Sequence, residues 1–384
     1  MEVVSNEPLA DQNYNAIVSG SNGSNPSKKR QNTVMPLPKT PEEMGMVEPA
    51  AIPTRRLAPI LFLIVLTPMV EFLTGSSSLV GMASNIPLLL TFILVTIPVY
   101  TLPVLLIREA LVAWNKGLPS LLSLGIAYGA INEGLAAKTY FSFFPLSPKL
   151  GGGPGVGRWL GINWPWVTEI TLFHMIVSMS VPVALSFLIF PETRSQRFFT
   201  ARGVRGLLAG LVVMLVPLNI LEYAFLAPGF KGNAPLLILP VSVILVFVYI
   251  AHKLPKPEPK KTLHGILARP LPLALASLAF FIITFTPVLE YFPVAQIFSY
   301  LFYHYSGAPG IIATFYPIIL AALAIRFFAR YLLSEIQLLA IIGGVLTIPI
   351  ITSLVLHDFL QGGPIAAIAY IASILAAWRR VRKK

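Results

Sequence analysis

Residues 86–107 read IPLLLTFILVTIPVYTLPVLLI and contain no charged side chain. About 20 mainly apolar residues in a helix are enough to cross the hydrocarbon core of a bilayer. The run ends at Arg108 and Glu109, which we interpret as a neighbouring ion pair at the membrane interface. We therefore predict a transmembrane helix here.

The composition of the 384-residue chain fits a membrane protein. Hydrophobic residues make up 55% and charged residues 11%, whereas soluble proteins carry about 25% charged residues. The sequence predicts an all-α fold, a polytopic transmembrane helix bundle of about ten spans. The predicted spans are 57–73, 86–107, 118–137, 167–190, 204–226, 234–251, 271–291, 311–328, 335–356 and 364–378.

The distribution of Lys and Arg predicts the orientation. If the connections alternate between two sides, 24 of the 28 Lys and Arg lie on the side that also holds both termini. An excess of basic residues is typical of cytoplasmic loops. We therefore expect a multi-pass protein of the cell membrane with cytoplasmic N- and C-termini. Its expected partner is the lipid bilayer, and the net charge of +12 calls for no nucleic acid.

Composition divides the chain into four parts. Residues 1–56 form a polar tail that is too poor in apolar residues to fold alone, so we expect it to be disordered and cytoplasmic. Residues 57–251 form a first bundle of six spans, 252–270 a basic cytoplasmic linker, and 271–384 a second group of four spans with a basic C-terminal tail. Cysteine is absent, which excludes disulfides and thiolate metal sites, and no metal or cofactor is expected.

Acidic residues recur at the predicted outer ends of the odd-numbered spans. They are Glu71, Glu133, Glu222, Glu290 and Asp358, and span four begins on the same side with Glu169. A helix C-terminus disfavours a carboxylate by up to about 1 kcal/mol, and membrane depth adds a cost of desolvation. These positions therefore favour a shared outward-facing cavity that binds a small cation, a proton or an amine. The alternative is that each acid reaches the interface or pairs locally.

Two of the polar residues stand out within the spans. Glu133 lies in YGAINEGLAA (128–137), where small residues allow close helix packing. His174 shares one helix face with Thr171 and Ser178. If spans three and four pack antiparallel, Glu133 and His174 form an acid–base pair, so they are the candidate catalytic residues. The candidate residues for binding a substrate or cation are Glu71, Glu133, Glu169, His174, Glu222 and Glu290.

Two segments hint at an internal repeat. TPMVEFL (67–73) and TPVLEYF (286–292) share a Pro before the Glu and an aromatic residue after it. The two spans are predicted to run in the same direction. Whether they reflect a duplication stays open.

Several motifs resemble an uncharacterised prokaryotic family of multi-pass membrane proteins. They are YGAINEGLAAKTYF (128–141) and RWLGINWPW (158–166), and the similarity covers roughly residues 57–205. This resemblance implies membrane integration and no particular activity.

A more distant resemblance is to the CAAX-type glutamate intramembrane proteases. In that family a Glu-Glu-x-x-x-Arg helix activates water with the help of His residues. Glu133 matches the second Glu, and His174 follows on the next span. Asn132 replaces the first Glu, and Ala137 stands where the Arg is expected. The resemblance implies a hydrolase that uses Glu133 and His174.

Three functions therefore remain open. The first is a transporter or an ion- or proton-coupled carrier with an outward-facing, carboxylate-lined cavity. The second is a membrane-embedded hydrolase or an enzyme that modifies a lipid-like substrate, with Glu133 as general base and His174 as its partner. The third is a non-catalytic membrane scaffold. We rank the carrier first because carboxylates recur on several spans. The oligomeric state and the substrate are left open.

Overall fold

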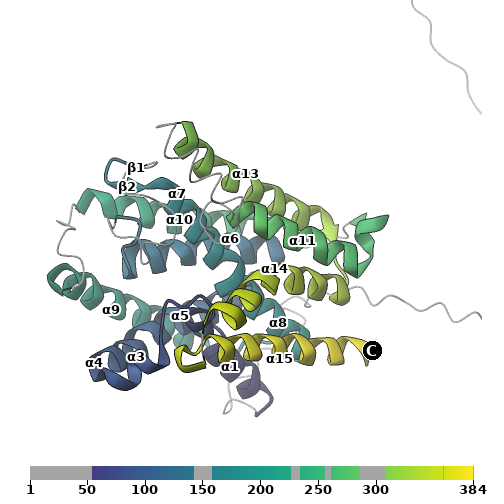
Figure 1. Cartoon of the computed structure of the whole chain (residues 1–384). Coiled ribbons are helices and arrows are strands. Elements are labelled where there is room, and N and C mark those ends of the chain that lie inside the picture. Colours follow the sequence, from purple (N-terminus) through teal and green to yellow (C-terminus); the bar gives the residue numbers. More distant parts are fainter. Residues whose placement is uncertain are drawn as a thin grey trace, which may run out of the picture. The chain divides into compact units, whose positions relative to one another are not determined.

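The computed structural model describes residues 54–141, 158–225, 234–255, 261–285, 308–357 and 359–383, with their side chains except those of 54, 55, 158, 216–225, 234, 308–311 and 313. Helices make up nearly all of this part of the chain, which confirms the predicted all-α class (Figure 1). Each of the ten ranges predicted as spans overlaps at least one helix of the structure.

The helices fall into three kinds. The α-helices are α1 (Thr54–Leu66), α2 (Met69–Leu73), α3 (Leu79–Ser84), α4 (Ile86–Thr91), α5 (Ile97–Ala113), α6 (Leu118–Gly129), α7 (Trp164–Phe173), α8 (Val181–Ile189), α9 (Ala201–Phe225), α10 (Ile238–Lys253), α11 (Pro270–Phe285), α13 (Ala308–Arg330), α14 (Glu335–Leu356) and α15 (Gly363–Arg382). The π-helices are η1 (Phe92–Thr96), η2 (Ala130–Ala136) and η3 (His174–Ser180). The 3-10 helices are η4 (Pro191–Thr193), η5 (Ala234–Leu237), η6 (Ile266–Ala268) and η7 (Phe359–Gln361).

Six continuous helical segments of the described chain are long and apolar enough to cross a membrane. They are Arg56–Leu73, Ile86–Ala113, Trp164–Ile189, Pro235–Lys253, Glu335–Leu356 and Gly363–Arg382. Helix α11 is equally apolar but has 16 residues, fewer than the roughly 20 that a span needs.

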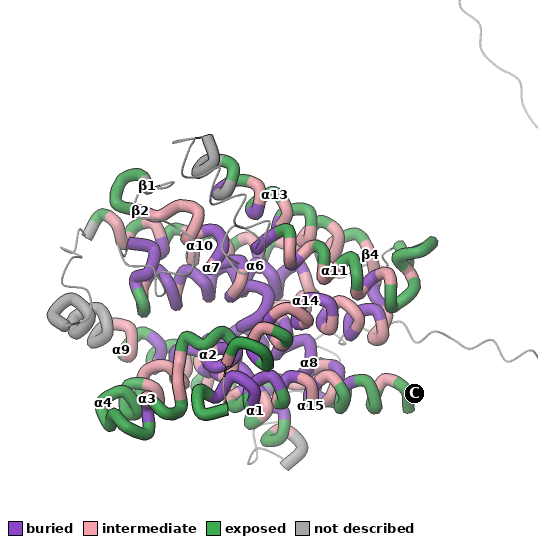
Figure 2. Tube along the Cα trace, viewed as in Figure 1, coloured by how far each residue is buried: buried purple, intermediate pink, exposed green. Residues whose placement is uncertain are grey.

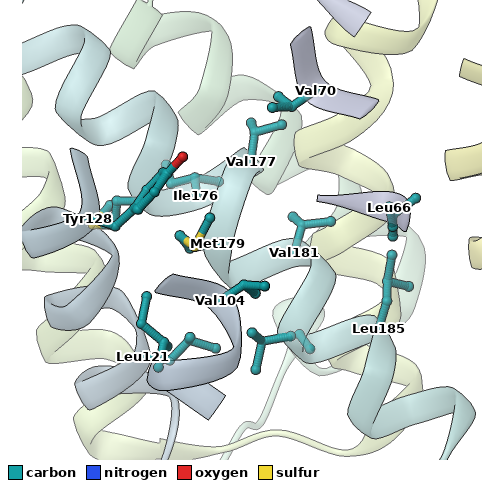
Figure 3. Close-up of a cluster of buried hydrophobic side chains, with 14 of the residues drawn as sticks. Leu66, Val70, Val104, Leu121, Tyr128, Ile176, Val177, Met179, Val181 and Leu185 are labelled. Atoms are coloured by element: carbon teal, nitrogen blue, oxygen red, sulfur yellow. The ribbon is translucent and has the colours of Figure 1, made fainter. Parts of the chain in front are cut away.

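The apolar side chains divide between a packed core and an exposed surface. Val104 of α5, Val177 of η3 and Leu185 of α8 are fully buried in one apolar cluster (Figure 3). Leu63 of α1 is fully buried in the same core. Large apolar side chains are exposed on the outer helices, and Val355 of α14 is 73% exposed. The exposed stretches recur along α4, α11 and α15 (Figure 2). So much exposed apolar surface marks contact with a membrane or with other protein.

Two glycines let α6 approach α7 and η3 closely. A Cβ on Gly125 would lie 2.8 Å from the Cα of Met175, and one on Gly129 would lie 2.8 Å from the Cα of Thr171. Real Cβ atoms do not approach a backbone so closely, so only glycine fits at both positions. The sequence predicted that small residues in this segment allow close helix packing. In the structure α6 is buried and packs closely on α7 and η3.

The predicted basic linker contacts the second group of helices. Strand β3 (Lys261–Thr262) pairs in parallel with β4 (Tyr331–Leu332) between α13 and α14. Helices of the two predicted groups also pack against each other, α13 on α7 and α15 on α8. The remaining pair, β1 (Arg158–Trp159) and β2 (Ile162–Asn163), is an antiparallel hairpin that leads into α7.

The predicted ion pair between the neighbours Arg108 and Glu109 is present, and it is buried in protein. Arg108 is 1% exposed and Glu109 is 2% exposed, because the connection from α8 to α9 covers them. The Arg108 guanidinium lies 2.5 Å from Glu109 Oε1, donates to the carbonyl of Thr193 and stacks 3.3 Å over the Phe198 ring. The backbone N–H of Phe198 donates to Glu109 over 2.8 Å.

Candidate functional site

The candidate site forms where side chains from two π-helices come into contact. Glu133 lies in η2, and His174 is the first residue of η3. Helix α6, which leads into η2, packs on η3, and α7, which leads into η3, packs on η2. A π-helix shifts the side chains that follow it relative to an α-helix, and such segments are frequent at functional sites.

Glu133 and His174 are in direct contact. His174 Nε2 lies 2.7 Å from Glu133 Oε1, and His174 Nδ1 lies 2.8 Å from the hydroxyl of Ser178. Both residues are buried, with 6% of Glu133 and 3% of His174 exposed. This is the acid–base pair that antiparallel packing of the two spans predicted. The geometry fits an imidazole that donates from Nε2 to the carboxylate and accepts from the Ser178 hydroxyl at Nδ1.

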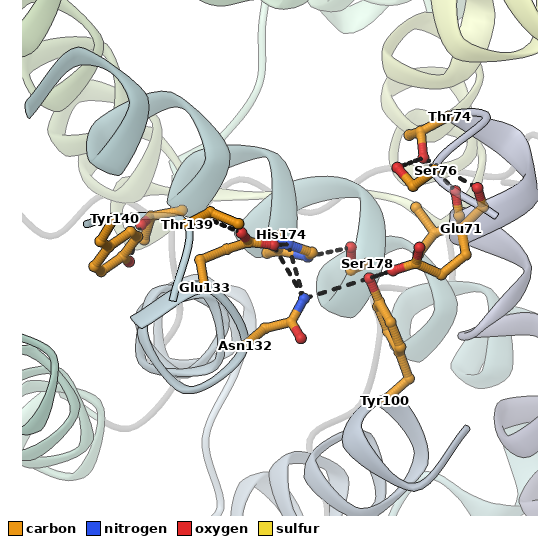
Figure 4. Close-up of polar contacts among 12 residues, drawn as sticks. Glu71, Thr74, Ser76, Tyr100, Asn132, Glu133, Thr139, Tyr140, His174 and Ser178 are labelled. Carbon is orange, nitrogen blue, oxygen red and sulfur yellow. Dashed lines mark hydrogen bonds and ion pairs between the residues drawn. The ribbon is translucent and has the colours of Figure 1, made fainter. Parts of the chain in front are cut away.

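Asn132 joins this pair to a second carboxylate. Its Nδ2 lies 3.0 Å from His174 Nε2 and 3.2 Å from Glu133 Oε1, and it donates over 3.4 Å to the hydroxyl of Tyr100. The Tyr100 hydroxyl in turn donates to Glu71 Oε1. Figure 4 shows this continuous chain of contacts, which runs from Glu71 through Tyr100 and Asn132 to the Glu133 carboxylate and its partner His174. We call these residues, with Glu133 and Ser178, the carboxylate–histidine cluster.

Neutral donors complete the surroundings of both acids. The Thr139 hydroxyl donates to Glu133 Oε2 and accepts over 3.0 Å from the indole N–H of Trp166. The Ser77 hydroxyl donates to Glu71 Oε2 over 3.3 Å. Tyr128 packs edge-on against the His174 ring, with ring centroids 5.4 Å apart. The acids thus hold a defined orientation.

Tyr140 follows η2 and connects this part of the chain to α7. Its hydroxyl is hydrogen-bonded to the Thr171 hydroxyl. Burial raises the pKa of the Tyr140 phenol above its ordinary value. The phenol therefore stays protonated at neutral pH and acts as a donor or a structural bridge, not as a base.

The structure brings three of the predicted site residues together: Glu71, Glu133 and His174. Glu169 is buried on α7 and makes no hydrogen bond to any of them. The side chain of Glu222, and Glu290 and Asp358 as a whole, lie outside the described residues. Within the described part of the chain, no group of three or more His, Asp or Glu side chains could hold a metal ion.

Sequence reasoning missed the residues that link the acids. Tyr100 is 2% exposed and lies between Pro98 and Pro103 in the apolar run 86–107. A phenol buried within such a run needs a hydrogen-bond partner, so its position was a usable signal. Thr139 and Trp166 gave no signal, because their contact with Glu133 depends on the turn after η2.

Comparisons with known proteins add no assignment to this geometry. No protein-family model, curated protein or solved structure matches the chain. The chemistry of the site must therefore be argued from its own residues.

Proposed function

We propose that the protein is a proton-coupled carrier of the cell membrane, with ten spans and both termini in the cytoplasm. The ten helical ranges and the bias of Lys and Arg to one side support this topology. Under this topology Glu71 and Glu133 lie near the outer ends of their spans. The cluster then faces the outside of the cell.

One observation carries the proposal: the contact between Glu133 and His174 continues through Asn132 and Tyr100 to Glu71. Histidine and carboxylates are the groups that gain and lose protons under physiological conditions. Ionisable residues inside membrane helices are costly and are typical of ion and proton pathways.

The contacts come from four helical segments, so a change in protonation acts on their packing. Glu71 lies in α2, Tyr100 in α5, Glu133 in η2 and His174 in η3. A proton that arrives at His174 or Glu133 converts their hydrogen bond into an ion pair or removes an acceptor. Either change alters how η2 and η3 pack, which couples proton binding to movement of the helices. The cargo would be a small cation or an amine that competes with the proton for the carboxylates.

Charge displacement after a pH jump tests this function. The full-length protein is reconstituted in liposomes and adsorbed on a solid-supported electrode, and the transient current is recorded. We expect a current in the wild type and a much smaller one in Glu133→Gln, because an amide cannot release a proton. Exposed Glu192 provides the matched control, and Glu192→Gln should keep the current. Equal currents in wild type and Glu133→Gln would contradict the proposal.

A second candidate function is a membrane-embedded hydrolase. The specific observation in its favour is the orientation of His174, which is held at Nε2 by Glu133 and at Nδ1 by Ser178. A carboxylate that contacts a histidine is able to activate water as a general base. If the protein hydrolyses a lipid or a peptide in liposomes, Glu133→Gln should lower the rate by about 10²–10⁴-fold. Hydrolysis without charge displacement would favour the enzyme over the carrier.

A further inference from the structure

Glu169 is a buried acid that the carboxylate–histidine cluster does not use. It lies in α7 and is 1% exposed. Neither of its carboxyl oxygens has a hydrogen-bond partner among the residues that the structure describes. An ionised carboxylate that is buried without donors or a cation is strongly disfavoured, whereas a protonated acid is tolerated far better.

The orientation of α7 places Glu169 away from the cluster. Thr171, two residues further on, contacts the Tyr140 hydroxyl and packs against Gly129. Side chains two residues apart on an α-helix point about 200° apart. Glu169 is therefore turned away from α6 and η2, and it is an independent site.

A titratable group that interacts electrostatically with Glu169 is Tyr316. Helix α13 packs on α7, and Tyr316 of α13 lies within electrostatic range of Glu169. The Tyr316 hydroxyl donates to the carbonyls of Ile283 and Thr284, each over 3.0 Å, in the last turn of α11. It thereby ties α13 to α11.

The other titratable groups packed around α7 face the cluster. Tyr128 on α6 and Glu133 on η2 both contact His174 on η3. Tyr140, which follows η2, contacts Thr171. Tyr316, in contrast, interacts electrostatically with Glu169.

A proton suits this site better than a metal ion. The described residues offer no group of three or more His, Asp or Glu side chains, and a hard cation needs six or more oxygen ligands. A proton needs only one carboxyl oxygen. We propose that Glu169 is a second proton-binding site, protonated in this arrangement, and that Tyr316 becomes its hydrogen-bond donor when the proton leaves.

Release of the proton would couple to the packing of the helices. When the proton passes to water, the carboxylate attracts the Tyr316 hydroxyl away from the α11 carbonyls of Ile283 and Thr284. The contact between α13 and α11 then loosens while that between α13 and α7 tightens. This inference is independent of the carrier function, because it concerns a different face of α7.

Infrared spectroscopy of the full-length protein in liposomes tests the proton directly. The difference spectrum of wild type minus Glu169→Gln should contain the C=O stretching band of a protonated carboxylic acid, which shifts in D₂O. Glutamine is neutral and of nearly the same shape, so the fold should survive. A difference spectrum that contains only the bands of an ionised carboxylate would overturn the proposal. The matched control is Glu192→Gln, which removes an exposed acid and should lack the protonated band.

A tyrosine variant tests the role of Tyr316. Without its hydroxyl the ionised carboxylate lacks a donor, so in Tyr316→Phe the protonated band should persist to higher pH than in the wild type. Tyr249→Phe is the control, since Tyr249 is 62% exposed on α10. If the band titrates identically in Tyr316→Phe and the wild type, Tyr316 is not the donor and that part of the proposal fails.

Discussion

Arg108–Glu109 and Glu133–His174 are both buried acid–base pairs, but their partners differ. Glu109 contacts a guanidinium and accepts from the backbone N–H of Phe198. Arginine keeps its charge at any physiological pH, so this pair is permanently charged. Glu133 instead contacts the imidazole of His174, and imidazole is the type of side chain that exchanges protons most readily near neutral pH. The comparison teaches that burial alone does not mark a functional site; the ability to exchange a proton separates the two pairs.

The local backbone differs between the two pairs as well. Arg108 and Glu109 follow one another within the regular helix α5. Glu133 and His174 lie in the π-helices η2 and η3. A π-helix is less stable than an α-helix and persists where a functional arrangement needs it. The regular pair thus anchors the fold, whereas the irregular pair forms the candidate site.

The largest expected effect on stability comes from breaking the permanent pair. In Arg108→Leu the buried carboxylate of Glu109 loses its close, buried cation and keeps only Arg197, which lies 3.7 Å away and is half exposed. We expect a loss of about 3–5 kcal/mol of unfolding free energy. Thermal unfolding in detergent measures the loss. The control is Arg380→Leu, which breaks an exposed pair of 3.4 Å with Glu192 and should cost about 0–1 kcal/mol. Equal losses of unfolding free energy in the two variants would show that burial does not strengthen the Arg108–Glu109 pair.

The second-largest effect is expected at Tyr100, which links Glu71 to Asn132 and Glu133. Tyr100→Phe removes a hydroxyl that donates to Glu71 and accepts from Asn132. A hydrogen bond to a charged group contributes about 1.5–3 kcal/mol, so a loss of this order is expected. The charge displacement after a pH jump should fall but stay above background, because the Glu133–His174 contact remains. An unchanged current would separate Glu71 from the site.

Close packing of α6 on α7 gives a third test. In Gly129→Ala the new Cβ meets the Thr171 backbone at 2.8 Å, and overpacking of this kind costs about 1–3 kcal/mol. The new Cβ pushes α6 away from α7, and η2 directly follows Gly129. The charge displacement after a pH jump should therefore also decrease. The matched control is Gly206→Ala on α9, where a Cβ meets nothing within 4 Å. That variant should gain about 0.5–1 kcal/mol, and a loss there as large as in Gly129→Ala would contradict the packing argument.

The smallest effect is expected at the contact between His174 and Ser178. Ser178→Ala removes one neutral hydrogen bond of 2.8 Å, which contributes about 0.5–1.5 kcal/mol. The carrier proposal expects the charge displacement to persist, because Glu133 still holds the imidazole. Complete loss of the current in a folded Ser178→Ala variant would mean that Ser178, and not Glu133, controls His174.

Much of the helical pattern could be predicted from the sequence. Residues 86–107 lie within the continuous helical segment Ile86–Ala113, because a long apolar run has no other way to satisfy its backbone in a membrane. The pairing of Glu133 with His174 was predictable from antiparallel neighbours and from small residues on span three. The links through Tyr100 and Thr139 were not predictable, since they depend on how α5 and the turn after η2 are rotated.

The sequence by itself determined the helices, their order and the candidate acids, because hydropathy and segment length are local properties. Only the tertiary structure decided which acids meet. It joined Glu71 to His174 and turned Glu169 towards α13. The physical reason is that a side chain's direction depends on the rotation and packing of its helix, and here two π-helices and two glycines set that rotation.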